Sequence, residues 1–253
     1  MPELTYDLHI HSCLSPCGDD DMTPANIVHM AALKKLDLIA VTDHNSCKNC
    51  PAVAKLCDAY GMTALPGMEL TTAEEIHVVC LFSGLNEAMA FDDYVSHHLI
   101  PFPNNEKIFG KQLIYDADDQ LTGTVQNLLV NATDISFDDI YPLMKAYNGI
   151  MIPAHIDKPS NSLLATFGFI PPDSCFSCAE VKDIQKLPEL LKQQPYLEKC
   201  CIIKNSDAHF LGNISEPVRH ISAGSRRPED IIHALKHPQA VTSANKAVQL
   251  LHS

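Results

Sequence analysis

Residues 4–11, Leu4-Thr5-Tyr6-Asp7-Leu8-His9-Ile10-His11, form an apolar run that ends in two histidines. In a β-strand, residues two apart face the same side, so His9 and His11 can point at one ion. The same arrangement, an apolar run that ends in a metal-binding side chain, recurs at residues 41–44, 67–69, 75–77, 153–155 and 206–209. This recurrence predicts a fold that delivers imidazoles and carboxylates to one rim.

Length and composition indicate a globular chain that is long enough to form a barrel domain. It has 253 residues, 46% of them hydrophobic and 19% charged, which excludes a disordered protein and fits a single barrel domain over residues 1–253. The formal net charge of −13 argues against a nucleic-acid partner, because phosphate neutralisation needs clustered Lys and Arg. A small anionic substrate is compatible with this charge, since divalent ions would dominate the local potential.

The chain is expected to be cytoplasmic and not membrane-bound. No basic leader, apolar leader or 18-residue apolar stretch is present. In that compartment the ten cysteines are expected to be free thiols or metal ligands. The two C-x-x-C pairs, Cys47 with Cys50 and Cys175 with Cys178, leave open a structural zinc or iron–sulfur site, although small buried apolar residues would explain most of them.

Alternating strand and helix patterns predict a parallel sheet covered by helices. Strands are expected at about 4–11, 38–42, 64–69, 76–82, 149–154, 178–181, 200–205 and 218–222, and helices at about 24–36, 51–60, 137–147 and after Pro228. Thr23 and Ser136 are the expected N-caps of two of these helices. Seven or eight strands with helices between them favour a closed or nearly closed barrel.

The alternation breaks over residues 83–135, which is too long for a plain connection. We interpret this segment as an insertion on the active-site rim, with a helix at about 86–99 and a hairpin formed by 111–115 and 120–125. The alternative is a surface extension without a role in the site.

Taken in order, the histidine and carboxylate motifs resemble those of the PHP domain, the polymerase and histidinol phosphatase superfamily of metal-dependent phosphoesterases. The resemblance is strongest in 5–83 and 150–211, and it implies a distorted (β/α)7, TIM-like barrel with two or three divalent ions, zinc, manganese or iron. It also implies the ligands: His9, His11, Glu69 and Asp207 for one ion, Glu69, His77 and His155 for a second, and His44 and His209 for a third.

One position departs from the family pattern. Ser15-Pro16-Cys17-Gly18 places a cysteine where family members usually have His or Asp. Cys17 could bind zinc or ferrous iron as a thiolate. The alternatives are that the third ion is absent, or that Asp19 or Asp20 replaces the ligand.

Such a centre implies hydrolysis by a metal-bridging hydroxide, which coordination makes available near neutral pH. Asp207 or His155 would move the proton, and Lys158 and Arg219 are the candidate substrate contacts. We therefore expect a phosphoesterase that acts on a small phosphorylated metabolite or nucleotide. A related hydrolase of carbon–nitrogen bonds and a non-catalytic metal-binding regulator are the alternatives.

Overall fold

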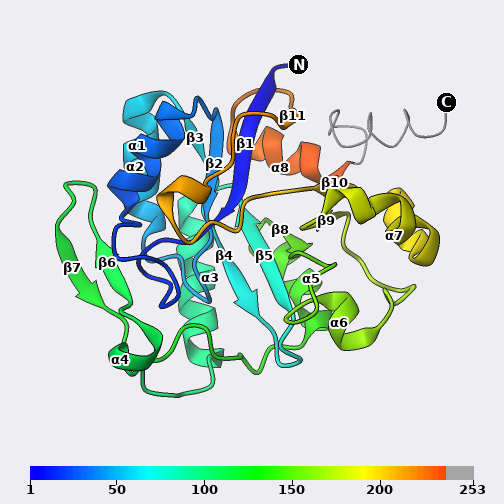
Figure 1. The fold of residues 1–253 in the computed structure, drawn as a ribbon, viewed down its shortest axis with the longest axis horizontal. Helices are drawn as coiled ribbons and strands as arrows, with labels where there is room; N and C mark the ends of the chain where they lie inside the picture. The colour runs from blue at the N-terminus through cyan, green and yellow to red at the C-terminus, as the bar shows by residue number, and fades with distance from the viewer. Residues whose placement is uncertain (238–253) are drawn as a thin grey trace.

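A computed structural model describes residues 1–237 (Figure 1). The strands are β1 (Glu3–Ile10), β2 (Leu38–Val41), β3 (Thr63–Ala64), β4 (Gly67–Thr71), β5 (His77–Phe82), β6 (Leu113–Tyr115), β7 (Leu121–Thr124), β8 (Gly149–Pro153), β9 (Cys178–Glu180), β10 (Cys201–Ile203) and β11 (His220–Ser222). The α-helices are α1 (Pro24–Leu33), α2 (Cys50–Tyr60), α3 (Leu85–His98), α4 (Glu106–Phe109), α5 (Phe137–Ala146), α6 (Leu163–Phe167), α7 (Leu187–Gln193) and α8 (Pro228–Lys236). This mixed α/β architecture confirms the expected class.

Most expected elements lie close to their expected bounds, but one expected strand is divided into two. The run at 64–69 is split into β3 and β4 at Pro66, which has no N–H to donate to a strand ladder. The helices α6 and α7 were not expected, because five and seven residues are too few to show a helical period.

The prediction of a wholly parallel sheet is wrong. Strands β1, β2 and β3 pair in parallel, and so do β9 and β10, but β11 is antiparallel to β1 and the β4–β5–β8 sheet is antiparallel throughout. The short connection over residues 72–76 explains the β4–β5 pair, because a parallel crossover needs a dozen residues or more.

Single backbone contacts link these sheets at the carboxyl ends of their strands. Isolated bridges join Ile10 to Ala208 and His44 to Glu69, and the N–H of Ile156 donates to the carbonyl of Glu180 at 2.9 Å. Within residues 1–237 no continuous ladder closes these sheets into one barrel. The links nevertheless hold the strand ends next to one another, which is what a shared site requires.

Helices α1 and α2 cover β2 and β3 (Figure 1). Thr23 caps α1, since its Oγ1 accepts from the N–H of Asn26 at 3.3 Å, and Pro24 occupies the first turn. The buried face of α1 includes Ile27, which packs in a cluster with Ile39 of β2. Truncating such a side chain to Ala costs about 2–5 kcal/mol.

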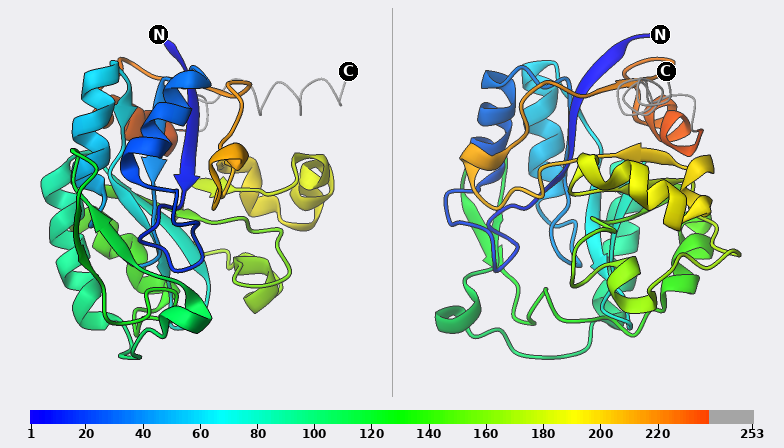
Figure 2. Two further views of the ribbon diagram at one scale, coloured as in Figure 1. Left: turned by 60° about the vertical axis from the view of Figure 1, so that its left-hand side comes forward. Right: turned by 45° about the vertical axis from the view of Figure 1, so that its right-hand side comes forward.

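The 83–135 segment contains the expected helix, α3, and the expected hairpin, β6–β7. It packs against the loops that follow β1 and β2, as both views in Figure 2 show for the hairpin. The N–H of Leu113 donates to the carbonyl of Cys13 at 2.9 Å, and Asn49 Nδ2 donates to the carbonyl of Leu113 at 3.2 Å. Gly110, at φ 98°, lies so close to the carbonyl oxygen of Pro16 that a Cβ there would collide with it.

All ten cysteines are free thiols, and each is buried except Cys17 and Cys175. Burial of most of them fits small apolar side chains in the core. No helix within residues 1–237 is both long and apolar enough to cross a bilayer.

Candidate metal centre

Glu69, on β4, lies at the centre of a ring of imidazoles. Its Oε1 is 3.0 Å from His77 Nδ1, 3.1 Å from His155 Nε2 and 3.3 Å from His9 Nε2, and its Oε2 is 3.1 Å from His44 Nδ1 and 3.4 Å from His11 Nε2. These side chains come from β1, β5 and the segments after β1, β2 and β8. Residues remote in sequence therefore converge on one carboxylate.

Asp207 forms a second carboxylate position beside this ring. Its Oδ1 is 3.4 Å from His11 Nε2 and 3.7 Å from His9 Nε2, and it lies 3.8 Å from His209 Nδ1. The rings of His11 and His209 stack with centroids 4.3 Å apart. The other oxygen, Oδ2, is 2.7 Å from Lys158 Nζ.

Three groups of donors have ligand atoms that all lie within 4.8 Å of one another: His9, His11 and Glu69; His44, Glu69 and His77; and His11, His44 and His209. The groups share members, as expected for neighbouring ions with common ligands. His44 Nδ1 has no hydrogen-bond partner among residues 1–237, although Glu69 Oε2 is 3.1 Å away. The two atoms lie close enough together to be ligands of one cation.

Hydrogen bonds set the tautomers of the first two histidines. Ser15 donates its hydroxyl proton to Asp43 Oδ1 at 2.6 Å, so its oxygen accepts from His11 Nδ1 at 3.0 Å. His9 Nδ1 is 2.9 Å from a carboxylate oxygen of Glu180, which can only accept. Both contacts place the proton on Nδ1 and turn Nε2 toward the centre, the arrangement a metal ligand needs.

The electrostatics favour the charge states that bind cations at Glu69, His11 and His44, but not at His9. Burial raises the pKa of Glu69, but His77 and His9 outweigh it and hold that pKa well below its ordinary value. Burial lowers the pKa of His11 well below the usual range, and burial also lowers that of His44. For His9, burial is outweighed by Glu180 and Glu69, which raise the pKa well above its ordinary value. Ionised carboxylates and neutral imidazoles are the metal-binding forms, so an ion would have to displace a proton from His9.

Two donor residues have strained backbones. His155 has φ 29° and Asp207 has φ 56°, in the left-handed region that residues other than glycine adopt at a cost. Each turns the chain just after a strand end and directs its side chain into the centre.

Sequence reasoning missed Glu180 and Lys182. Glu180 is 1% exposed, contacts His9 and accepts from Asn205 Nδ2 at 2.7 Å. The sequence contains the pattern that could have identified Glu180, because residues 178–180 are another short apolar run that ends in a carboxylate. Lys182 Nζ lies 3.6 Å from Asp207 Oδ2, beside Lys158, and no sequence pattern marks it.

Three expected ligands, Cys17, His155 and Asp207, belong to none of the three donor groups found within residues 1–237, although His155 Nε2 lies 3.1 Å from Glu69 Oε1 and Asp207 Oδ1 lies 3.4 Å from His11 Nε2. Cys17 is exposed. Arg219 directly precedes β11, whose ladder pairs His220 with Thr5 and so lies toward the start of β1, while the histidines lie at its end. The roles of the three ligands and of Arg219 as a substrate contact stay predictions.

A fold of linked sheets around clustered histidines and carboxylates defines a metal-dependent hydrolase class, and sequence comparison names the family. The family model described as the PHP domain matches residues 7–153. The chain belongs to the PHP domain family.

Relatives and solved structures agree with this membership. The 5'-3' exoribonuclease Rnm of Salmonella typhimurium is 35% identical over 81 residues, covering 30% of this chain and 27% of that protein. An uncharacterized protein of Methanocaldococcus jannaschii is 34% identical over 89 residues, covering 32% of this chain and 50% of that protein. The chain thus spans at most half of either relative.

Among solved structures, the lesion-specific endonuclease EndoQ of Pyrococcus furiosus superposes with a TM-score of 0.62 and 17% identity, covering 93% of this chain and 56% of that one. A protein from Bifidobacterium adolescentis, described as a metal-dependent phosphoesterase, gives a TM-score of 0.56 and 16% identity over 83% of this chain and 90% of that one. At such identities the likeness shows the fold alone.

These findings correct the expectation that nucleic acids are excluded as partners. One relative is an exoribonuclease, and Endonuclease Q has been crystallised with a 27-mer duplex substrate. The charge argument assumed that basic side chains must meet the phosphates. Divalent ions can meet them instead, so a net charge of −13 does not exclude a nucleic-acid substrate.

Proposed function

We propose that this chain is a metal-dependent phosphoesterase that cleaves phosphate esters of nucleotides or of single-stranded nucleic acid. The observation that carries the proposal is the carboxylate of Glu69, which has imidazole nitrogens from five histidines within 3.4 Å. A buried carboxylate with so many imidazoles is costly unless cations compensate the donors.

His9, His11, Glu69 and Asp207 would hold one ion, Glu69, His77 and His155 would hold a second, and His44 and His209 would be available to a third. Cys17 would complete that third site if its loop moved inward. When bound, such ions supply a hydroxide near neutral pH and stabilise charge on phosphate oxygens. We propose also that the linked strands form the distorted seven-stranded barrel of the family.

The protein's own residues would then bind the substrate phosphate and transfer protons. His11 and His9 outweigh burial and hold the pKa of Asp207 below its usual range, so this carboxylate stays ionised beside the centre. Lys158 and Lys182 bring ammonium groups to within 2.7 and 3.6 Å of Asp207 Oδ2, where they can bind substrate phosphate oxygens. We assign proton transfer to Asp207 or His155, and phosphate orientation to the two lysines.

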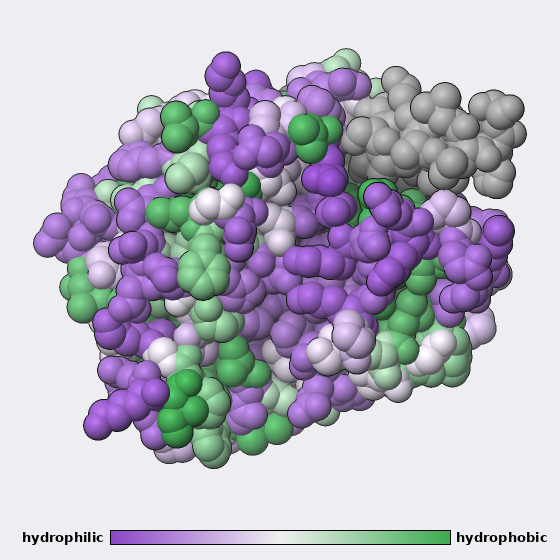
Figure 3. All heavy atoms as spheres, in the orientation of Figure 1, coloured by the Kyte–Doolittle hydropathy of each residue, from purple (hydrophilic) through white to green (hydrophobic). Residues whose placement is uncertain are grey.

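Exposed aromatic side chains on the insertion support the proposed substrate class. Phe102 and Phe109 are 49% and 37% exposed, with ring centroids 6.4 Å apart. Phe102 precedes α4, and Phe109 is the last residue of that helix. Figure 3 shows apolar side chains over α4 at the lower left of a face whose middle is hydrophilic. Exposed aromatic rings can stack on unpaired bases, and the stacking itself needs no charge on the protein. Base stacking on the insertion and phosphate binding at the centre would suit an acidic protein.

The test is a substrate panel with the metal-loaded protein. It compares p-nitrophenyl phosphate, nucleoside monophosphates, short RNA and DNA strands, and amide substrates, with manganese, zinc or iron supplied. We expect phosphate release or strand shortening that Glu69→Gln abolishes and Glu75→Gln, an exposed carboxylate outside the donor groups, leaves intact. Amide turnover without phosphate release, or tight metal binding without turnover, would overturn the proposal.

A further inference from the structure

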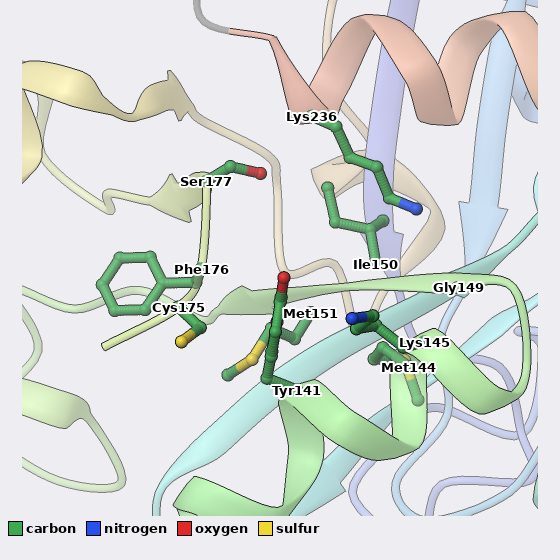
Figure 4. Close-up of a pocket in the computed structure, with 10 residues that line it drawn as sticks. All are labelled: Tyr141, Met144, Lys145, Gly149, Ile150, Met151, Cys175, Phe176, Ser177 and Lys236. Carbon is green, nitrogen blue, oxygen red and sulfur yellow. The ribbon is translucent and has the colours of Figure 1, made fainter. Parts of the chain in front are cut away.

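A cavity lies away from the donor groups, at the opposite end of β8 from His155. Its volume is about 350 Å³, and it is bordered by α5, the start of β8, residues 175–177 and the end of α8 (Figure 4). Small-molecule sites occupy roughly 300–1,000 Å³, so the cavity can hold a compact ligand. β8 runs from Gly149 at this cavity to Pro153, two residues before His155.

The floor of the cavity is apolar. Met144, Ile150, Met151 and Phe176 line it, and each is at most 4% exposed. Thioether sulfurs make favourable contacts with aromatic rings, so this floor suits an aromatic or other apolar body.

The rim of the cavity carries lysine ammonium groups and side-chain hydroxyl groups. In Figure 4, Ser177 and Tyr141 direct their hydroxyl groups toward the space between them, Lys236 reaches down from α8, and Lys145 extends toward Tyr141. Lys145 Nζ lies 5.9 Å from the centre of the Tyr141 ring. Neither lysine forms an ion pair with any residue in 1–237, although the acidic residues of the chain outnumber the basic ones by 31 to 18.

We propose that this cavity binds a small amphipathic anion, with an apolar or aromatic body on the methionine and phenylalanine floor and an anionic group between Lys145 and Lys236. Carboxylate, sulfonate and phosphate groups share the chemistry that the two ammonium groups recognise. The ligand would contact the start of β8 while the metal centre stays open. The site is therefore independent of the proposed hydrolysis.

The test uses 8-anilinonaphthalene-1-sulfonate, an aromatic sulfonate that a phosphoesterase cannot hydrolyse, with the full chain. We expect a saturable rise in fluorescence with one site per chain, accompanied by a higher Tm. Lys145→Glu combined with Lys236→Glu should weaken binding about tenfold or more, because charge-assisted contacts are lost and repulsion replaces them. Lys35→Glu combined with Lys55→Glu makes the same change in net charge on exposed lysines that do not line the cavity, and should leave binding unchanged.

A second variant keeps the charge and fills the space. Ser177→Trp should abolish the saturable signal while circular dichroism and hydrolysis of p-nitrophenyl phosphate stay as in the wild type. Equal binding by the wild type and the Lys145/Lys236 variant would overturn the proposal. So would competition between the probe and a phosphate substrate, which would place the probe at the metal centre. A failure of the hydrolase proposal would leave the fluorescence titration and the thermal shift unaffected.

Discussion

The metal centre and the 83–135 insertion meet at one edge of the molecule but are stabilised differently. At the centre, His9, His11 and Glu69 are at most 1% exposed, and each contacts several other donors. On the insertion, Leu121 and Ile108 are 55% and 70% exposed. The proposed chemistry depends on mutually supporting buried groups. If the insertion selects the substrate as we propose, its exposed residues can change at little cost to the fold.

Removing the ions would give the largest effect and would test the first half of this contrast. Treatment with a chelator should abolish turnover and lower the Tm, because the donors would lose the cations that compensate their burial. Activity and thermal unfolding before and after chelation check this, and added manganese or zinc should restore both. Undiminished turnover in the metal-free protein would contradict the assignment.

A smaller loss of metal affinity or turnover is expected from Glu180→Gln. This substitution keeps the shape of the side chain but weakens its hydrogen bond with His9 Nδ1. Partners of this kind contribute about 10–100-fold to metal affinity or activity. Metal titration and kcat measured at saturating metal separate weaker binding from slower chemistry. Glu75→Gln is the matched control, and equal metal affinity in both variants would show that Glu180 does not position His9.

The insertion is tested by replacing Phe102 and Phe109 together with Ala. Stacking contributes about 1–3 kcal/mol per base, so KM for a short RNA strand should rise roughly tenfold while p-nitrophenyl phosphate is cleaved as before. Phe169→Ala, which removes a ring 56% exposed outside the insertion, serves as the control. A parallel loss on both substrates would mean that the insertion supports the fold and does not select the substrate.

The smallest effect is expected far from both regions. Thr23→Ala removes the cap of α1 and should lower the free energy of unfolding by about 0.5–2 kcal/mol, with turnover unchanged. Denaturant unfolding measures this, with the exposed Thr166→Ala as a comparison. Altered turnover in Thr23→Ala would show that α1 is coupled to the centre.

The structure brings the predicted donors together but arranges the sheets differently from the prediction. The strand ends that carry His9, Glu69 and His155 could be located from the sequence because alternation and burial are local properties, while the role of these residues as ligands stays a prediction. The antiparallel pairing of β4 with β5 follows from the short connection between them, but the pairing of β5 with β8 joins strands on either side of the 83–135 segment, which periodicity does not encode. Lys182 could not be found either, because it approaches Asp207 only through the pairing of β9 with β10.

The left-handed backbones at His155 and Asp207 restrict which residues evolution or engineering can place there. Glycine would relax the main chain but supply no ligand, and β-branched residues would be strained at these angles. Asparagine tolerates the conformation and keeps an oxygen, so Asp207→Asn separates the charge of the ligand from its geometry. These two positions are therefore suited to retuning the affinity for different ions without redesigning the surrounding scaffold.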